Sequence, residues 1–271
     1  MKYETLRDIS LPRIGFGTWK IGGGSSPDPA LEKRSLAALG SALELGYTHF
    51  DTAEHYADGY AEELLGLAIR QAGIPRGKLF ITSKVWPNHL RFEDVLRSCA
   101  GSLRRLHTEY LDLYLIHWPA QLVSLRETFR ALNQLVRDGR VRHIGVSNFT
   151  LRLLKQAHYL AESPLVTDQV PYSIYDRTYV RNGVLAYCQE NDILLTAYSP
   201  LEAGRLRPHP ILQSIADELH ATPHQVALAW LASQPRVIAI PASFDPRHQA
   251  ENLAAVDLTL SPSQMDRLNQ L

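Results

Sequence analysis

The sequence predicts an α/β protein, a single-domain (β/α)8 TIM barrel over residues 1–271. One observation is that short apolar runs rich in β-branched and aromatic residues alternate with longer segments of helical period. Another is that eight such runs occur with no break in composition and no linker between two domains. An open, doubly wound sheet is the competing arrangement, and the count of eight favours the closed barrel.

The elements follow in order along the chain. We expect strands near 14–17 and at 46–51, 79–84, 110–117, 141–147, 165–169, 193–198 and 237–241. Between them, apolar residues recur at three- and four-residue spacing, which predicts helices that include 31–45, 61–72, 92–107 and 125–137. Residues 3–14 are expected to form a β-hairpin around Asp8 that caps the barrel floor. Ser261 and Pro262 predict the N-cap and first residue of a C-terminal helix.

The composition excludes several classes of partner. The chain has 28 Lys+Arg and 28 Asp+Glu, so its formal net charge is zero. Neither nucleic-acid binding nor membrane-surface binding is expected, because both use a surplus of basic charge. There is no apolar run of membrane-spanning or signal-peptide type, and Cys99 and Cys188 lack metal-ligand spacing. We therefore expect a cytoplasmic protein with reduced thiols and a small-molecule partner; a monomer is slightly favoured.

Ionisable side chains end three successive predicted strands. Asp51, Lys84 and His117 are equally spaced along the chain, so they are expected at equivalent positions on neighbouring strands. Adjacent parallel strands lie about 4.8 Å apart, which would bring the three side chains within hydrogen-bonding range of one another. They would meet at the end of the barrel where catalytic sites form. Tyr56 follows soon after Asp51, on a loop over that cavity.

These four side chains predict a device for donating a proton. A phenol titrates near pH 10, about three units too high for a fast donor at neutral pH unless its anion is stabilised. Lys84 would stabilise the phenolate, Asp51 would keep the lysine charged, and His117 would add a hydrogen-bond donor. Such a set protonates a carbonyl oxygen while negative charge develops on it. The set has no hydride source of its own, so a cofactor is required.

The motifs around these residues are similar to those of the aldo-keto reductase superfamily. Residues 46–56 resemble its GYxxxDTAxxY signature, Lys84-Val85-Trp86 its lysine segment and His117-Trp118-Pro119 its HWP segment. Residues 139–149 resemble its GKxRxIGVSNF block. Further positions follow in the family's order, so the resemblance extends from residue 15 to 252: Gln169, 198–201 and 240–252.

The resemblance implies hydride transfer from NADPH to an aldehyde or ketone, with Tyr56 as proton donor and Asp51, Lys84 and His117 beside it. It also implies that Ser147, Asn148 and Gln169 bind the carboxamide and that Tyr198 stacks beneath the nicotinamide. The pyrophosphate would follow residues 199–201, and the adenine would lie near 251–252. The other cofactor-binding positions implied are Gly17, Thr18, Trp19, Asp51, Ser199, Pro200, Leu201, Ile240, Ser243, Arg247, Glu251 and Asn252.

One block departs from the family pattern. Ala242 stands where many members have lysine, and His248 stands where an arginine is common. Those cations bind the 2′-phosphate that distinguishes NADPH from NADH. Arg247 and Ser243 are possible substitutes, so NADPH is the expected cofactor and use of NADH stays open.

Three tryptophans predict the substrate pocket. Trp19, Trp86 and Trp118 each follow a strand, where they would line an apolar cavity. The sequence runs only from Asn252 to Leu271 after the last motif, so the long C-terminal loop of many relatives would be short or absent. We expect an open pocket for small to medium carbonyl compounds, with aromatic or α-keto aldehydes reduced best.

Two other functions would use the same residues. Lys84 could form a Schiff base, as in a lyase, although pairing with Asp51 would keep its amine protonated and non-nucleophilic. A non-catalytic, nicotinamide-binding module that senses redox state is the other, and the intact tetrad argues against it. No metal site is expected, because Pro223 separates His220 from His224.

Overall fold

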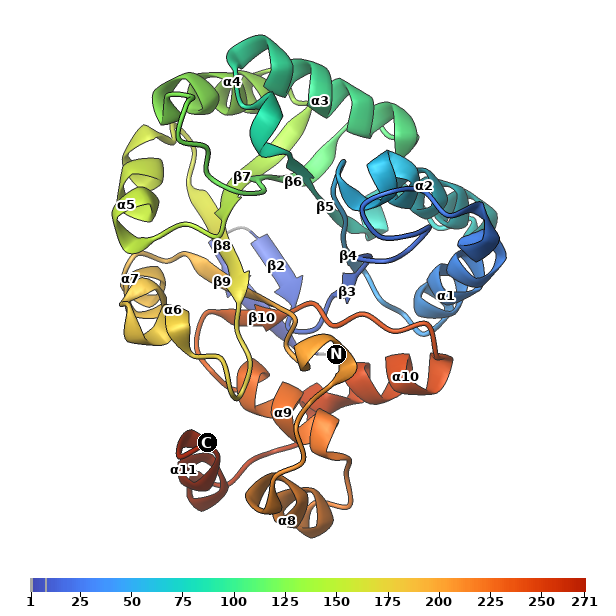
Figure 1. Cartoon of the computed structure of the whole chain (residues 1–271), viewed down its shortest axis with the longest axis vertical. Helices are drawn as coiled ribbons and strands as arrows, with labels where there is room; N and C mark the ends of the chain where they lie inside the picture. The colour runs from blue at the N-terminus through green and yellow to red at the C-terminus, as the bar shows by residue number, and fades with distance from the viewer. Residues whose placement is uncertain (1, 8) are drawn as a thin grey trace.

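Eight parallel strands form a closed ring in this computed structural model, which describes residues 2–7 and 9–271 (Figure 1). Each strand pairs with the next along the chain, and a parallel bridge between Ile14 and Ala239 joins the first to the last. The Gly15 amide donates to the Ala239 carbonyl at 2.9 Å across that junction. The closed (β/α)8 barrel is confirmed. The strands are β3 (Phe16–Gly17), β4 (His49–Asp51), β5 (Phe80–Val85), β6 (Leu111–Ile116), β7 (Val141–Ser147), β8 (Leu165–Pro171), β9 (Leu194–Tyr198) and β10 (Val237–Ala239).

Helices surround this ring (Figure 1). They are α1 (Glu32–Glu44), α2 (Tyr60–Ala72), α3 (Phe92–Arg105), α4 (Leu125–Arg137), α5 (Leu151–Leu160), α6 (Thr178–Arg181), α7 (Val184–Glu190), α8 (Pro210–Glu218), α9 (Pro223–Ala232), α10 (Pro246–Ala254) and α11 (Pro262–Asn269). On α4 the buried residues include Phe129, Leu132 and Leu135, one apolar stripe facing the sheet. Ser261 caps α11 as expected, accepting from the Gln264 amide at 3.2 Å. The predicted elements differ from the observed ones mainly at their ends.

A hairpin closes the end of the barrel opposite the site. Strands β1 (Tyr3–Leu6) and β2 (Ile9–Pro12) pair antiparallel, and β2 is visible through the centre of the ring (Figure 1). The predicted hairpin is confirmed, while its expected turn residue Asp8 lies outside the described residues. Its buried side chains form one cluster with apolar residues of the barrel strands, so the floor is sealed by hydrophobic packing: Leu6, Ile9, Leu11, Leu113, Leu115, Val166, Leu194 and Ile238.

The strands are staggered at the level of the expected site. Asp51 pairs with Thr82, two residues before Lys84, and Lys84 pairs with Leu115, two residues before His117. Side chains two residues apart face the same side of a strand, so the three ionisable groups share the interior face. Each one, however, lies two residues further toward the end of its strand than the group before it. The expectation of equivalent positions is therefore wrong. A closed barrel requires tilted, sheared strands, and a constant sequence interval includes this shear.

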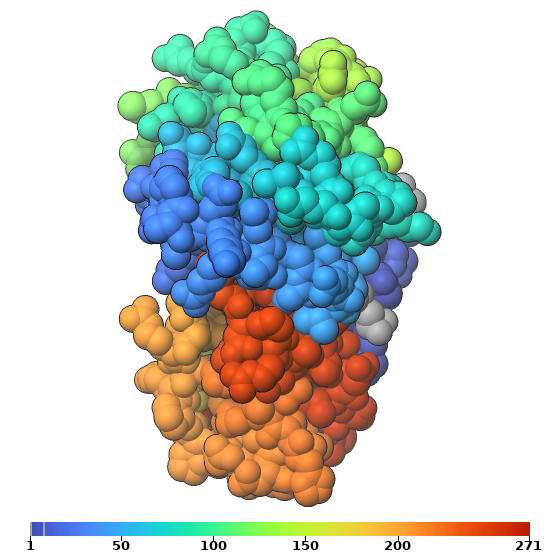
Figure 2. Space-filling view, turned by 90° about the vertical axis from the view of Figure 1, so that its right-hand side faces the viewer, coloured from blue at the N-terminus to red at the C-terminus, as the bar shows by residue number. Residues whose placement is uncertain are grey.

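Helix α10 lies against α1 on the outer surface (Figure 2). The Ser41 hydroxyl of α1 donates to the Gln249 side chain of α10, whose amide donates to the Ala38 carbonyl at 3.0 Å. The Tyr47 hydroxyl also donates to the Gln249 carbonyl at 2.8 Å. These bonds fix the helix that carries several of the expected cofactor-binding residues.

Candidate active site

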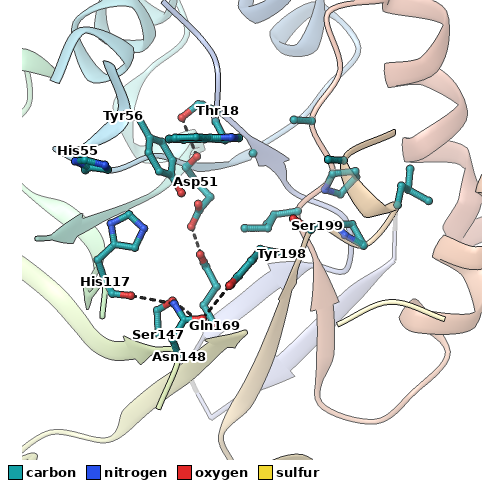
Figure 3. A pocket seen from close by; sticks show the side chains of 18 of the residues that line it. Thr18, Asp51, His55, Tyr56, His117, Ser147, Asn148, Gln169, Tyr198 and Ser199 are labelled. Carbon is teal, nitrogen blue, oxygen red and sulfur yellow. Dashed lines mark hydrogen bonds between the residues drawn. The ribbon is translucent and has the colours of Figure 1, made fainter. Parts of the chain in front are cut away.

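A cavity of about 440 Å³ opens where the barrel strands end (Figure 3). Lys84 lies beneath it, completely buried. The cavity brings together most of the residues that the sequence analysis singled out, from the ends of the strands and the loops that follow them. Those that line it are Gly17, Thr18, Trp19, Asp51, Tyr56, Trp86, His117, Trp118, Ser147, Asn148, Gln169, Tyr198, Ser199, Pro200, Leu201 and Ile240.

The Lys84 ammonium is the centre of the expected tetrad. It donates to Asp51 Oδ1 at 2.5 Å, to the Thr52 carbonyl at 2.8 Å and to the Tyr56 hydroxyl at 3.2 Å. An ammonium has three protons, so these three acceptors use all of them. The lysine is thereby fixed on the phenol that the sequence predicts as proton donor.

His117 lies in the site, but its side chain does not form the expected hydrogen bond to Lys84 or Asp51. Its ring lies edge-on to Tyr56, with 5.6 Å between centroids, and edge-on to Trp86 at 5.1 Å. Burial, with help from the nearby Lys84 charge, lowers the pKa of His117 to about 2. The imidazole is therefore neutral, with one N–H to donate and one nitrogen to accept. The two-residue displacement between β5 and β6 explains why His117 does not bond to Lys84: it places His117 above the lysine, beside the phenol ring of Tyr56.

Burial and charge act in opposite directions on Tyr56. Burial raises the pKa of its phenol, and the Lys84 charge and hydrogen bond lower it by less, so the net shift is upward. Burial lowers the pKa of Lys84, but Asp51 and Tyr56 together raise it by more. The net shift is upward, so the amine stays charged. Lys84 thus acts on the Tyr56 pKa in the predicted direction, but burial, which the prediction left out, outweighs it. The phenol holds its proton at rest, next to a cation that favours the anion left after transfer.

Amide and hydroxyl groups form the adjoining wall of the cavity (Figure 3). The side-chain amide of Gln169 donates to Asp51 Oδ2 at 2.7 Å. The Ser147 hydroxyl donates to the backbone carbonyl of Gln169 at 2.7 Å. The Tyr198 hydroxyl donates to Asn148 Oδ1 at 2.9 Å. The wall therefore has fixed polar groups of the type that bind a carboxamide and an aromatic ring that can pack against a nicotinamide.

The first strand supplies the opposite side. A Cβ atom on Gly17 would lie 2.7 Å from the Ile240 carbonyl oxygen, so only glycine permits this close approach of the first and last strands. The Thr18 hydroxyl donates to the Asp51 carbonyl at 3.0 Å. The Trp19 ring lies 5.1 Å from that of Tyr56, and 42% of the residue is exposed. Trp19 therefore forms a wall beside the predicted proton donor, Tyr56.

Some lining residues were not singled out from the sequence. His55 is the most informative, because its ring stacks on Trp86 with 3.6 Å between centroids and 10° between planes. Its place next to Tyr56 on the loop over the cavity was the available signal. The others are Ala203 and Gly204, while Pro241 and Ala242, which also line the cavity, belong to the block 240–252 that the sequence analysis did consider.

Four of the expected cofactor-binding residues lie outside this cavity: Ser243, Arg247, Glu251 and Asn252. Ser243 follows β10, and the other three are on α10. The Arg247 side chain is 83% exposed and pairs with Asp245 at 2.9 Å. Asn252 is buried. The structure thus places these residues beyond the cavity, and their contact with a cofactor stays a prediction.

Residues 2–7 and 9–271 contain neither a cluster of metal-binding side chains nor a helix that could span a membrane. No group of three or more His, Cys, Asp and Glu side chains there could hold a metal ion. His224 is the second residue of α9, whereas His220 precedes that helix. In the same part of the chain, every helix is too short or too polar to cross a bilayer.

Known proteins similar to this chain were identified by sequence. The sequence profile of the Aldo/keto reductase family matches residues 13–271. Methylglyoxal reductase YeaE of Escherichia coli (strain K12) is 38% identical over 269 residues, which cover 97% of this chain and 92% of that protein. Glyoxal reductase of Bacillus subtilis (strain 168) is 35% identical over 263 residues, which cover 97% and 90%.

Solved structures agree with the sequence matches. A thermostable aldo-keto reductase crystallised with the inhibitor epalrestat superimposes with a TM-score of 0.96 at 45% identity, covering 100% of this chain and 99% of that one. An aldo/keto reductase from Klebsiella pneumoniae in complex with NADP and acetate gives a TM-score of 0.89 at 36% identity, covering 99% and 94%. The chain belongs to the aldo/keto reductase family.

Proposed function

We propose that this chain reduces small aldehydes, 2-oxoaldehydes above all, to alcohols with NADPH, and that Tyr56 delivers the proton. The reaction class follows from the family: the chain is an oxidoreductase that reduces carbonyl groups with a nicotinamide cofactor. The observation that carries the residue roles is the contact of the buried Lys84 ammonium with the Tyr56 hydroxyl at the base of the cavity.

The cavity fits a nicotinamide cofactor, which when bound supplies the hydride that reduces the carbonyl carbon. Ser147, Asn148 and Gln169 would hold the carboxamide, and the Tyr198 ring would support the nicotinamide face. Hydrogen bonds within the wall already orient these groups. A further structure of an aldo-keto reductase from Klebsiella pneumoniae is a complex with NADPH, which favours that cofactor here.

The tetrad would provide the proton. Tyr56 keeps its proton at rest and donates it to the carbonyl oxygen as that oxygen becomes negative. Lys84 stabilises the phenolate that remains, and Asp51 keeps Lys84 charged and in place. Neutral His117 would donate its N–H to the same oxygen. The charged state of Lys84 disfavours a Schiff base at this position.

The relatives and the cavity together favour small dicarbonyl substrates. Two relatives carry the names methylglyoxal reductase and glyoxal reductase, and both compounds are small 1,2-dicarbonyls. Trp19 and Trp118, which both line the cavity, are 42% and 43% exposed, so two flat apolar rings are open to a ligand there. Such a site suits small planar carbonyl compounds.

The test is NADPH consumption with a panel of aldehydes, for the wild type, Tyr56→Phe and a control, Tyr60→Phe. Tyr60 begins α2 and its hydroxyl donates to Glu32 away from the cavity. We expect Tyr56→Phe to keep its affinity for NADPH and lose at least about 10²-fold in kcat, the scale of one positioned acid. Tyr60→Phe should stay near the wild-type rate. A Tyr56→Phe enzyme with more than half the wild-type kcat would refute the assigned role.

A further inference from the structure

His55 faces the substrate cavity and has no part in the proton transfer described above. Its ring lies beside Tyr56 and near His117, with 6.4 Å between the two imidazole centroids (Figure 3). No hydrogen bond joins the His55 ring to any of the residues drawn in Figure 3. Its ring nitrogens are therefore not used by the groups that surround the reacting carbonyl.

The position of the His55 ring is fixed by two neighbouring loops. The ring stacks on Trp86, with 3.6 Å between centroids. The preceding residue, Glu54, accepts from the Trp86 amide at 2.6 Å and contacts His89 Nδ1 at 3.0 Å. The loop after β4 is thus tied to the end of β5 by both a carboxylate and a ring stack. A polar group held in this way needs little reorganisation to meet a substrate.

A 2-oxoaldehyde has two oxygen atoms on adjacent carbons. If Tyr56 and His117 act on the oxygen that becomes the alcohol, the second oxygen lies one bond further along the substrate, within the same lining. An imidazole carries an N–H donor in either protonation state, and N–H···O bonds span about 2.9 Å. The neighbouring imidazole, His55, lies in that lining and can supply such a donor.

We propose that His55 is a specificity-determining residue that donates a hydrogen bond to the second oxygen of 2-oxoaldehydes. This inference rests on the proposed function, because it concerns which carbonyl compounds the same cavity prefers. A monoaldehyde has no second oxygen and gains nothing from His55. Preference for dicarbonyl compounds thus resides in the His55 wall, whereas the tetrad treats both substrate classes alike.

The test compares methylglyoxal with propanal, which has the same three carbons and lacks the second oxygen. His55→Phe keeps a flat ring against Trp86 and removes both ring nitrogens. We expect kcat/KM for methylglyoxal to fall about tenfold, the scale of one lost hydrogen bond, and kcat/KM for propanal to change less than about twofold. His55→Gln, which restores a donor without the ring, should recover part of the lost ratio.

The ratio of the two kcat/KM values separates the possible outcomes. An equal loss on both substrates, or no loss on either, would overturn the proposal and leave His55 a packing residue. NADPH binding by each variant checks that the site is folded. If His55→Phe does not fold, His55→Gln is compared with His55→Leu, which has no donor. A methylglyoxal-to-propanal ratio of kcat/KM that is no higher in His55→Gln than in His55→Leu also overturns the proposal. Wild-type activity on propanal with loss in Tyr56→Phe supports the proposed function whatever happens at His55.

Discussion

The two ends of the proposed cofactor site differ in how they are built. At the nicotinamide end, Asp51 and Lys84 are buried on adjacent strands, and hydrogen bonds fix their positions. At the adenosine end, Ala242 follows β10 and Arg247 projects from α10 with 83% of its side chain exposed. In the proposed function, the reaction chemistry would thus depend on groups that the barrel register places, whereas the choice of cofactor would depend on exposed groups that can change without disturbing the fold.

The largest effect should come from breaking the buried pair at the nicotinamide end. In Lys84→Met the Asp51 carboxylate is left buried without its partner, so we expect the free energy of unfolding to fall by about 3–5 kcal/mol. The phenolate also loses its stabilising cation, so kcat should fall at least about 10²-fold. Urea unfolding and NADPH consumption measure the two effects.

The double variant Asp51→Asn/Lys84→Met is the control for this change. It removes both charges, so most of the lost stability should return while the activity does not. A single variant as stable as the wild type would show that the pair is far more hydrated than its burial indicates.

A second buried carboxyl at the same end should behave in the opposite way. Asp168 on β8 accepts from the Phe149 amide at 3.4 Å through Oδ1, and its Oδ2 has no hydrogen-bond partner among the described residues. Burial raises its pKa well above the usual range, and the Phe149 bond offsets only part of this. Because the folded-state pKa is raised, the stability associated with the protonated carboxyl is complete below about pH 4 and is lost as the pH rises toward the folded-state pKa.

Asp168→Asn tests this reasoning, because asparagine has nearly the same shape and cannot ionise. We expect equal stability near pH 4, and near pH 8 a variant more stable than wild type, by about 1.4 kcal/mol for each unit by which the folded-state pKa of Asp168 exceeds its unfolded value. Urea unfolding at both pH values gives the difference, in which the titration of all other groups cancels. A difference that does not change with pH would contradict an ionisable origin.

The smallest effect is expected at the adenosine end. Arg247→Ala should raise KM for NADPH about fivefold and leave KM for NADH unchanged, because an exposed cation contributes a modest, charge-assisted contact to the 2′-phosphate. Arg97, which is 76% exposed and pairs with Asp94 on α3, provides a matched control in Arg97→Ala. Equal changes with the two cofactors would remove Arg247 from phosphate binding.

The fold could be predicted because its signals are local and repeated. The predicted helix at 125–137 and strand at 141–147 coincide with α4 and β7. The stagger could not be predicted, since the equal spacing of Asp51, Lys84 and His117 along the chain does not reveal how one strand is displaced against the next. Only the observed pairing of Asp51 with Thr82 shows this displacement.

The site was predictable where a side chain ends a strand, and less so elsewhere. Asp51 and His117 were recognisable by type and interval, and both line the cavity. The role of His55 depends on its stack with Trp86, which is distant in sequence, beyond α2 and β5, and is brought near by folding. The upward pKa shift of Tyr56 depends on burial, which the residue types alone do not reveal.

The apolar plug that β1 and β2 place beneath the barrel closes the rear of the reaction chamber, as far as residues 2–7 and 9–271 define it. Substrate and product would then both pass through the open side of the cavity, which Trp19 and Trp118 line with partly exposed indoles. A small inhibitor bound between these indoles would therefore block both substrate entry and product release, because the hairpin closes the other end of the barrel.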